Sequence, residues 1–131
     1  MRVLVCGSRD WADREALYGA LDRIAGVLHV TEVIHGNARG ADTMAGEWAA
    51  AHRIPVTAFP ADWQHLGRKA GPVRNRVMLQ LGLPRLVVAF PLGESRGTWD
   101  MVRVARKAGL TVWVMPNDLV MVDALGEGVF V

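Results

Sequence analysis

The sequence predicts an α/β fold, a doubly wound parallel sheet of about five strands in the order 3-2-1-4-5. Short apolar runs of strand length alternate along the chain with segments whose apolar residues recur at helical spacing. The run over residues 86–90 (LVVAF) is apolar throughout, which is typical of a parallel strand covered on both faces. Alternating strands and helices predict right-handed crossovers, and the doubly wound order is their usual result.

The chain of 131 residues is long enough to bury a core, and we expect one domain over 1–131. It is 51% hydrophobic, yet its longest apolar runs are strand-length, so we expect no membrane-spanning segment and no membrane partner. The start lacks the pattern of a signal peptide, and a single cysteine, Cys6, excludes an internal disulfide. We therefore expect a cytoplasmic location. The net charge of +2 is too small to demand a polyanionic partner.

The first strand and helix are predicted within residues 2–28. Residues 2–6 form the strand and 7–11 (GSRDW) the loop after it. Asp13 is expected to cap the helix, because its carboxylate can accept from the free N–H groups of the first turn. The apolar residues of this helix fall on one face: Leu17, Leu21, Ile24 and Leu28.

Residues 32–35 predict a second, short strand that ends at Gly36, followed by the loop 36–42 (GNARGAD). The next helix is expected to turn four residues inward: Met44, Ala45, Trp48 and Ala49. Residues 55–59 form the third strand. Residues 60–71 (PADWQHLGRKAG) contain Pro, Gly and charge without a clear period, so we expect a long loop there.

A short helix is expected to begin at Pro72, because proline suits the first helical turn, where its missing N–H is not needed. Its buried face is predicted from three residues: Val73, Val77 and Leu81. The fourth strand, 86–90, leads through a glycine-bearing loop to a helix capped by Thr98 and ended by Gly109. The inward positions of that helix are Met101, Val102, Ala105 and Ala108.

Residues 111–115 form the fifth strand, and the tail 116–131 has two apolar patches, 119–122 and 129–131, without a helical period. Chain ends fray in water unless other residues cover them. We therefore expect self-association as a homodimer or higher homo-oligomer, with cover from a neighbouring copy. The alternative is that the tail folds back on its own sheet.

The loops after the first, second and fourth strands are expected to meet at the crevice between strands 1 and 4, where the strand order reverses. Each contains glycine and a basic or hydroxyl residue. The start of the helix after the fourth strand also offers free N–H groups and a positive dipole end, which bind phosphate. Taken alone, that stretch could equally be an ordinary tight turn. The predicted ligand-binding residues are Gly7, Ser8, Arg9, Gly36, Asn37, Arg39, Gly40, Asp42, Arg74, Asn75, Ser95, Gly97 and Thr98.

Individual residues of this set have two interpretations. Three arginines either donate paired hydrogen bonds from the guanidinium to phosphate oxygens or are surface charges: Arg9, Arg39 and Arg74. Asp42 either accepts from a ribose hydroxyl or caps the second helix. Three tryptophans flank the expected crevice and either stack a base or pack in the core or at the rim: Trp11, Trp63 and Trp99. The four histidines and single cysteine lack metal-ligand spacing, so we expect no metal and no cofactor.

Five segments of the chain resemble the YspA, cpYpsA-related branch of the SLOG superfamily: GSRDW, HGNARGAD, PADW, AGPVRN and SRGTWDM. That superfamily is the Rossmann-like group joining the Smf/DprA proteins with the LOG phosphoribohydrolases. The resemblance runs from about Val3 to Val114. It implies a Rossmann-like fold with a nucleotide or nucleotide-derived ligand over the strand ends. The leading interpretation is therefore a small module that binds, and could sense, such a ligand.

The resemblance also implies two alternatives. In LOG enzymes, which cleave the N-glycosidic bond of a nucleoside 5′-monophosphate, an arginine matches Arg74 and a Gly-Thr pair matches residues 97–98. Their glutamate stands at Met101 here, and the nearest acid, Asp100, is rotated by ~100° on a helix. If the protein is an enzyme, Arg74 and Asp100 are the expected catalytic residues. The other alternative is a single-stranded nucleic-acid binder of the Smf/DprA type, supported by the basic stretch 65–76.

Overall fold

The computed structural model describes residues 1–127 and confirms the predicted fold. Five parallel strands lie in the order β3-β2-β1-β4-β5. Val3 of β1 pairs with Val33 of β2 on one side and with Leu86 of β4 on the other. The strands are β1 (Arg2–Gly7), β2 (Glu32–His35), β3 (Val56–Ala58), β4 (Leu86–Phe90) and β5 (Thr111–Val114).

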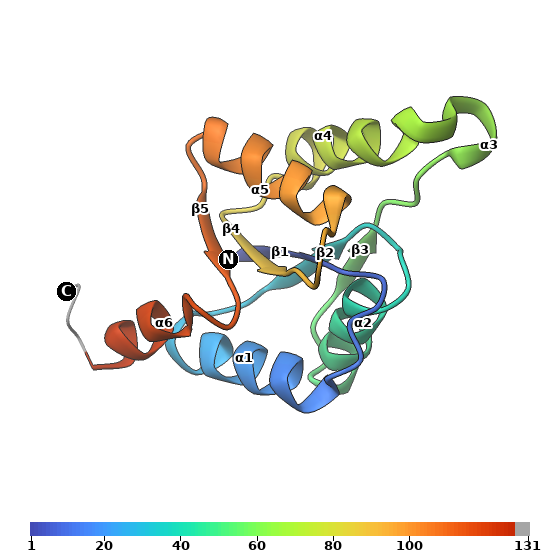
Figure 1. Cartoon of the computed structure of the whole chain (residues 1–131). Coiled ribbons are helices and arrows are strands. Elements are labelled where there is room, and N and C mark those ends of the chain that lie inside the picture. The colour runs from blue at the N-terminus through green and yellow to red at the C-terminus, as the bar shows by residue number, and fades with distance from the viewer. Residues whose placement is uncertain (128–131) are drawn as a thin grey trace.

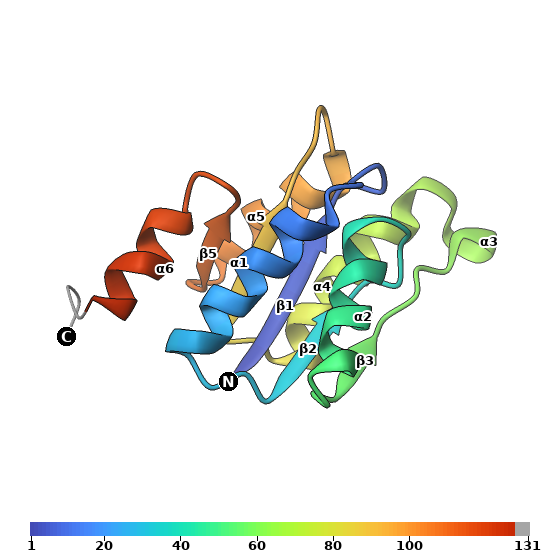
Figure 2. The ribbon, with the colours of Figure 1, turned by 90° about the horizontal axis from the view of Figure 1, so that it is seen from below.

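Helices cover both faces of the sheet (Figure 1), and Figure 2 shows the same arrangement from below. One face carries α1 (Arg14–Val27), α2 (Ala41–Ala51) and α6 (Leu119–Gly126). The other carries α4 (Ala70–Gly82) and α5 (Arg96–Lys107). Alternate residues of β1 and β4 enter the two cores: Val88 packs with α1 and α2, and Val87 with α4 and α5. Both central strands are therefore buried on both faces, as their apolar sequence predicts.

Most predictions for α1 and α2 are confirmed. Asp13 caps α1 and accepts from the backbone N–H of Ala16 at 3.0 Å. The inward residues of both helices are buried except Leu28, which follows the end of α1, and Met44, both of which are half-buried.

The prediction of a long loop over 60–71 was wrong. Helix α3 (Trp63–Leu66), a 3-10 turn η1 (Gly67–Lys69) and the start of α4 occupy most of it. Asp62 caps α3 through its side chain, accepting from the backbone N–H of His65 at 3.3 Å. The chain then turns at Gly67, whose φ of +56° favours glycine. Such short turns contain too few residues to show a hydrophobic period.

The predicted buried face of α4 was also wrong, because Val73 and Leu81 are 41% and 71% exposed. The buried residues are instead Ala70, Gly71, Asn75, Met78 and Gly82. Small residues let α4 approach the sheet, since a Cβ on Gly82 would come within 3.1 Å of Ile34. The polar Asn75 is buried because its amide is fully hydrogen-bonded.

The start of α5 differs from the prediction as well. Ser95, not Thr98, is the N-terminal cap residue, with a φ of +38°. Thr98 lies inside the first turn, where its hydroxyl is 2.6 Å from that of Ser95. At the other end, Ala108 follows the last helical residue and is exposed, and Gly109 ends the helix with a φ of +84°.

The tail contains the helix α6, so the expectation that it lacks a helix was wrong. Its eight residues give only about two turns, too few to establish a period. Val122 is buried against α1, so part of the tail folds back on its own domain. Val120 and Met121 stay exposed. The apolar patch 129–131 lies outside the described residues, and within 1–127 no helix is long and apolar enough to cross a membrane.

Candidate functional site

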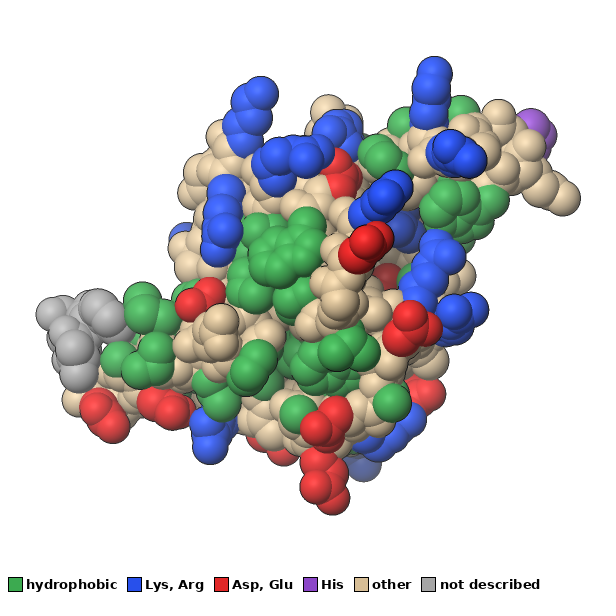
Figure 3. Space-filling view, viewed as in Figure 1, with side chains coloured by type: hydrophobic (Ala, Val, Ile, Leu, Met, Phe, Trp, Pro, Cys, Tyr) green, Lys and Arg blue, Asp and Glu red, His purple; other side chains and the backbone are tan. Residues whose placement is uncertain are grey.

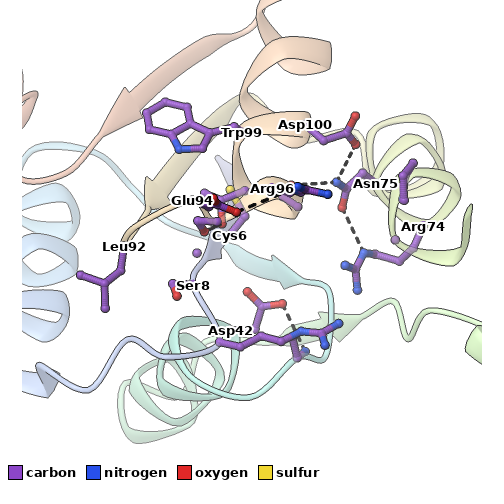
Figure 4. Close-up of a pocket in the computed structure, with 18 of the residues that line it drawn as sticks. Cys6, Ser8, Asp42, Arg74, Asn75, Leu92, Glu94, Arg96, Trp99 and Asp100 are labelled. Carbon is purple, nitrogen blue, oxygen red and sulfur yellow. Dashed lines mark hydrogen bonds and ion pairs between the residues drawn. The ribbon is translucent and has the colours of Figure 1, made fainter. Parts of the chain in front are cut away.

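A cavity of about 1040 Å³ opens at the carboxyl ends of β1 and β4, where the strand order reverses. Its walls come from the loop after β1, the starts of α2, α4 and α5, and the loop between β4 and α5 (Figure 4). These segments are far apart in the sequence. Parallel pairing of β1 with β4 brings them together, since residues at the same end of parallel strands share one edge.

Tight backbone packing fixes the floor of the cavity. The Ser8 N–H donates to the Phe90 carbonyl at 2.9 Å, and the Ser8 hydroxyl accepts from the Asp10 N–H at 3.1 Å. A Cβ on Gly7 would come within 2.5 Å of the Ala41 side chain. A glycine is therefore required at position 7 by the fold itself, whether or not a ligand is present.

Asp42 also lies at this floor and is 5% exposed. Its Oδ2 accepts from the backbone N–H groups of Gly36 at 3.1 Å and Ala38 at 3.2 Å. The carboxylate thus anchors the loop after β2 and does not cap α2, whose N-terminal cap residue is Gly40. Burial raises the pKa of Asp42 to about 6, against the opposing effect of these N–H donors and of Arg74.

The Arg74 guanidinium is held from two sides. Its Nη1 donates to the Gly36 carbonyl, and its Nε donates to Asn75 Oδ1 at 3.0 Å. Partial burial lowers the pKa of Arg74, while the Asp42 carboxylate opposes that shift. A Cβ on Gly36 would collide with the guanidinium, so glycine at that position leaves room for it. The Arg74 guanidinium is consequently fixed at the cavity wall.

Asn75 joins α4 to α5. Its Nδ2 donates to the Gly97 carbonyl at 3.1 Å and to Asp100 Oδ2 at 3.0 Å. Asp100 also pairs with Arg76 at 3.4 Å and with Arg103 at 2.7 Å. The amide of Asn75 is thus used within the protein, and the Asp100 carboxylate is held by groups of α4 and α5.

The first turn of α5 presents backbone donors to the cavity. No described residue accepts a hydrogen bond from the N–H groups of Arg96, Gly97 or Thr98. A Cβ added to Gly97 would meet no atom within 4 Å, so the fold itself does not require glycine there. These free donors and the helix dipole make this turn attractive to an anion.

Two of the three tryptophans line the rim. Trp63 and Trp99 are 47% and 42% exposed, and the Arg9 guanidinium lies 5.0 Å from the centroid of the Trp63 ring. Trp11 packs against Phe90 instead, with ring centroids 5.3 Å apart, and lies outside the cavity.

The structure brings nine of the predicted ligand-binding residues to the cavity wall: Gly7, Ser8, Arg9, Asp42, Arg74, Asn75, Ser95, Gly97 and Thr98. Four others do not line it: Gly36, Asn37, Arg39 and Gly40. Arg39 is an exposed residue paired with Asp10 at 3.5 Å, and the Asn37 N–H donates to His35 Nδ1 at 2.9 Å. Gly40, with a φ of +76°, packs against the Ser8 and Arg9 carbonyls.

Sequence reasoning missed three arginines of the cavity wall: Arg68, Arg96 and Arg103. The basic stretch containing Arg68 was the available signal for the first. Five arginines and four acidic residues line the wall, but Asp100 is paired with Arg103 and Glu94 lies 3.9 Å from Arg96. Within residues 1–127, Arg9 and Arg68 have no ion-pair partner, so the wall favours an anion. The same residues contain no cluster of three or more His, Cys, Asp or Glu suited to a metal ion.

Comparison with known proteins gives three similarities. A family model described as the YspA, cpYpsA-related SLOG family matches residues 1–65. The chain is 42% identical over 117 residues to the Gene 61 protein of Mycobacterium phage D29, a match covering 85% of this chain and 93% of that protein. The fold is similar to that of DNA processing protein A (DprA) from Streptococcus pneumoniae, with a TM-score of 0.68 and 21% sequence identity. That match covers 88% of this chain but 50% of the solved one, so the chain spans about half its length.

Proposed function

Since the chain belongs to the YspA, cpYpsA-related SLOG family, we propose that it binds a nucleotide-derived ligand through a phosphate group in the crevice between β1 and β4. Family and fold together support a module that binds a nucleotide or a nucleic acid. The geometry of the crevice favours the small ligand within that class.

One observation carries the proposal. The Asn75 amide binds Arg74 through its oxygen and the first turn of α5 through its nitrogen. A guanidinium fork and a set of free backbone N–H groups are thereby fixed to a single buried side chain. Both kinds of donor suit phosphate oxygens, and donors that are already positioned lose little entropy when the anion binds.

The size and rim of the cavity suit the rest of a nucleotide. Its volume of about 1040 Å³ lies at the upper end of the range of small-molecule sites. Trp63 and Trp99 offer exposed ring faces at its rim, and aromatic faces stack on bases. A phosphate near Arg74 therefore leaves space for a sugar and a base within the same cavity.

Calorimetric titration with AMP and GMP, beside adenosine and guanosine, tests the proposal. We expect the nucleotides to bind and the nucleosides to bind at least about tenfold more weakly, because the phosphate contacts are absent. Arg74→Lys should lose most of the affinity, because lysine keeps the charge but not the fork. The matched control is Arg106→Lys, an exposed residue in the last turn of α5. Equal binding of nucleotides and nucleosides, or full affinity in Arg74→Lys, would contradict the proposal.

No observation favours the N-glycosidic hydrolase. Met101, at the position of the LOG glutamate, is 0% exposed in the core, and Asp100 is held by Asn75, Arg76 and Arg103. Chromatography of AMP incubated with the protein tests for this activity through the release of free adenine.

Charge distribution favours a second candidate, binding of a nucleic-acid backbone. Residues 63–109 contain nine of the fifteen Lys and Arg residues but only two of the thirteen acidic ones. This segment includes α4 and α5, and Figure 3 shows Lys and Arg gathered over that half of the visible face, with most acidic side chains over the other half. An oligonucleotide mobility shift that weakens steeply with salt would support this candidate. A shift independent of salt would contradict it.

A further inference from the structure

The buried Asp42 carboxylate has one oxygen that the protein does not use. The two backbone N–H groups that bind this carboxylate, those of Gly36 and Ala38, both donate to Oδ2. No described residue donates a hydrogen bond to Oδ1, although the side chain is 5% exposed and lines the cavity. Figure 4 shows the carboxylate turned toward the cavity with only one of its oxygens joined by a dashed line. Among the described residues no fully buried side-chain oxygen or nitrogen lacks a partner, so Oδ1 is open to the cavity and available to a ligand donor.

The surroundings of Asp42 indicate a neutral donor as its partner. The positive charges of Arg74 and Arg9 already act on this carboxylate. A cationic ligand group would be repelled by the two arginines, and among the described residues Asp42 belongs to no group of three or more His, Cys, Asp or Glu that could hold a metal ion. A hydroxyl group meets no such repulsion.

Ser8 supports a hydroxyl at this floor. Its oxygen accepts from the Asp10 N–H, and its own hydrogen remains free for donation, since no described residue accepts from it. Asp42 Oδ1 and Ser8 Oγ therefore add an acceptor and a donor to the floor of one cavity. A sugar hydroxyl both donates and accepts, which matches this pair.

We infer that Asp42 is a specificity-determining residue whose Oδ1 accepts a hydrogen bond from the ribose 2′,3′-diol of the ligand. The site then selects ribonucleotides over nucleotides whose sugar lacks these hydroxyls. The inference rests on the proposed function, since it assigns the sugar of the same nucleotide. It also separates the crevice ligand from DNA, which lacks the 2′-hydroxyl and has its 3′-oxygens esterified.

The test compares AMP with 2′,3′-dideoxyAMP by calorimetry. We expect the wild type to prefer AMP by about tenfold or more, the factor for a hydrogen bond to a charged acceptor. The 2′-deoxy and 3′-deoxy analogues then show which hydroxyl is bound. Equal affinity for AMP and 2′,3′-dideoxyAMP would overturn the inference.

Asp42→Asn provides the decisive variant. Asparagine keeps one oxygen for the Gly36 and Ala38 N–H groups and places an NH₂ donor where Oδ1 stood. The ratio of the affinity for AMP to the affinity for the dideoxy analogue should fall toward one in this variant. Asp123→Asn, a matched change of charge at a half-exposed carboxylate of α6, should keep the wild-type ratio. An undiminished preference in Asp42→Asn would overturn the inference, and circular dichroism checks the fold of each variant. If Asp42→Asn does not fold, the wild-type analogue series alone decides.

Failure of the proposed function gives a different pattern. If AMP binds no better than adenosine but 2′,3′-dideoxyadenosine binds more weakly than adenosine, the phosphate proposal fails while the Asp42 inference stands. If AMP binds far better than adenosine but equally to its dideoxy analogue, the phosphate proposal stands and the Asp42 inference fails. Absence of binding by both AMP and adenosine overturns both.

Discussion

Gly97 offers a substitution whose effects on stability and on binding should have opposite signs. It is the second residue of α5 and lines the cavity. An added Cβ would meet no protein atom within 4 Å, so Gly97→Ala creates no clash in the free protein. It does place a methyl group beside the free N–H donors of the first turn, where we propose that the phosphate binds.

The gain in stability follows from helix propensity. Alanine is better than glycine by about 1 kcal/mol inside a helix, and we expect about half of that in the first turn. A domain of 131 residues shifts its Tm by about 4 °C for each kcal/mol, so Gly97→Ala should melt ~2 °C higher. Affinity for AMP should nevertheless fall by about tenfold, or ~1.4 kcal/mol, because the methyl group hinders close approach of the phosphate.

Differential scanning calorimetry and calorimetric titration measure the two effects. Gly19→Ala is the matched control, since Gly19 lies inside α1, outside this cavity, and its added Cβ also meets nothing within 4 Å. That variant should melt higher and bind AMP normally. Unchanged AMP affinity in Gly97→Ala would refute the phosphate site, and a lower Tm would refute the reasoning about its stability.

Three further predictions concern other parts of the molecule. Because burial raises the pKa of Asp42 from 3.8 to about 6, its contribution to stability is full below the lower value and is lost as pH rises through the upper one. Chemical denaturation should then show that the free energy of unfolding of the wild type falls between about pH 4 and pH 7 by of the order of 3 kcal/mol more than that of Asp42→Asn. Equal pH dependence of the two unfolding free energies would disprove this. Gly36→Ala should weaken AMP binding about as much as Arg74→Lys, since its Cβ displaces that guanidinium, and calorimetric titration at unchanged secondary structure measures the loss. Light scattering at micromolar concentration should give at least a dimer mass that Val120→Asp reduces to a monomer, because that side chain is 65% exposed; a wild-type monomer would exclude self-association.

Local sequence patterns were sufficient for the strands and their order. Each central strand is a short apolar run, and alternation with helices leaves few arrangements of a parallel sheet. The reversal between β1 and β4 then places the loops after both strands at one edge, which is why most predicted site residues line one cavity. Arg9 and Gly97 meet there because each follows the end of a correctly predicted strand, β1 or β4, whereas Arg74 joins them from the start of α4.

The sequence did not indicate which loop residues face inward. Asn37 and Arg39 stand in the same loop motif as Ala38, yet only Ala38 lines the cavity. The direction of each side chain depends on the loop backbone, which Asp42 fixes through two N–H groups. That anchor is a tertiary contact, and no periodicity reports it.

Helix α4 shows most clearly what the sequence determined and what only the tertiary structure decided. Its existence followed from local pattern, but the apolar Val73 and Leu81 point outward while the polar Asn75 is 2% exposed. Asn75 can be buried because Gly97 and Asp100, 22 and 25 residues away, satisfy its amide. A buried polar group without partners is costly, so the orientation of α4 depends on where α5 lies. Periodicity reports only the polarity of side chains along one segment, whereas burial of Asn75 requires partners that the fold brings from elsewhere in the chain.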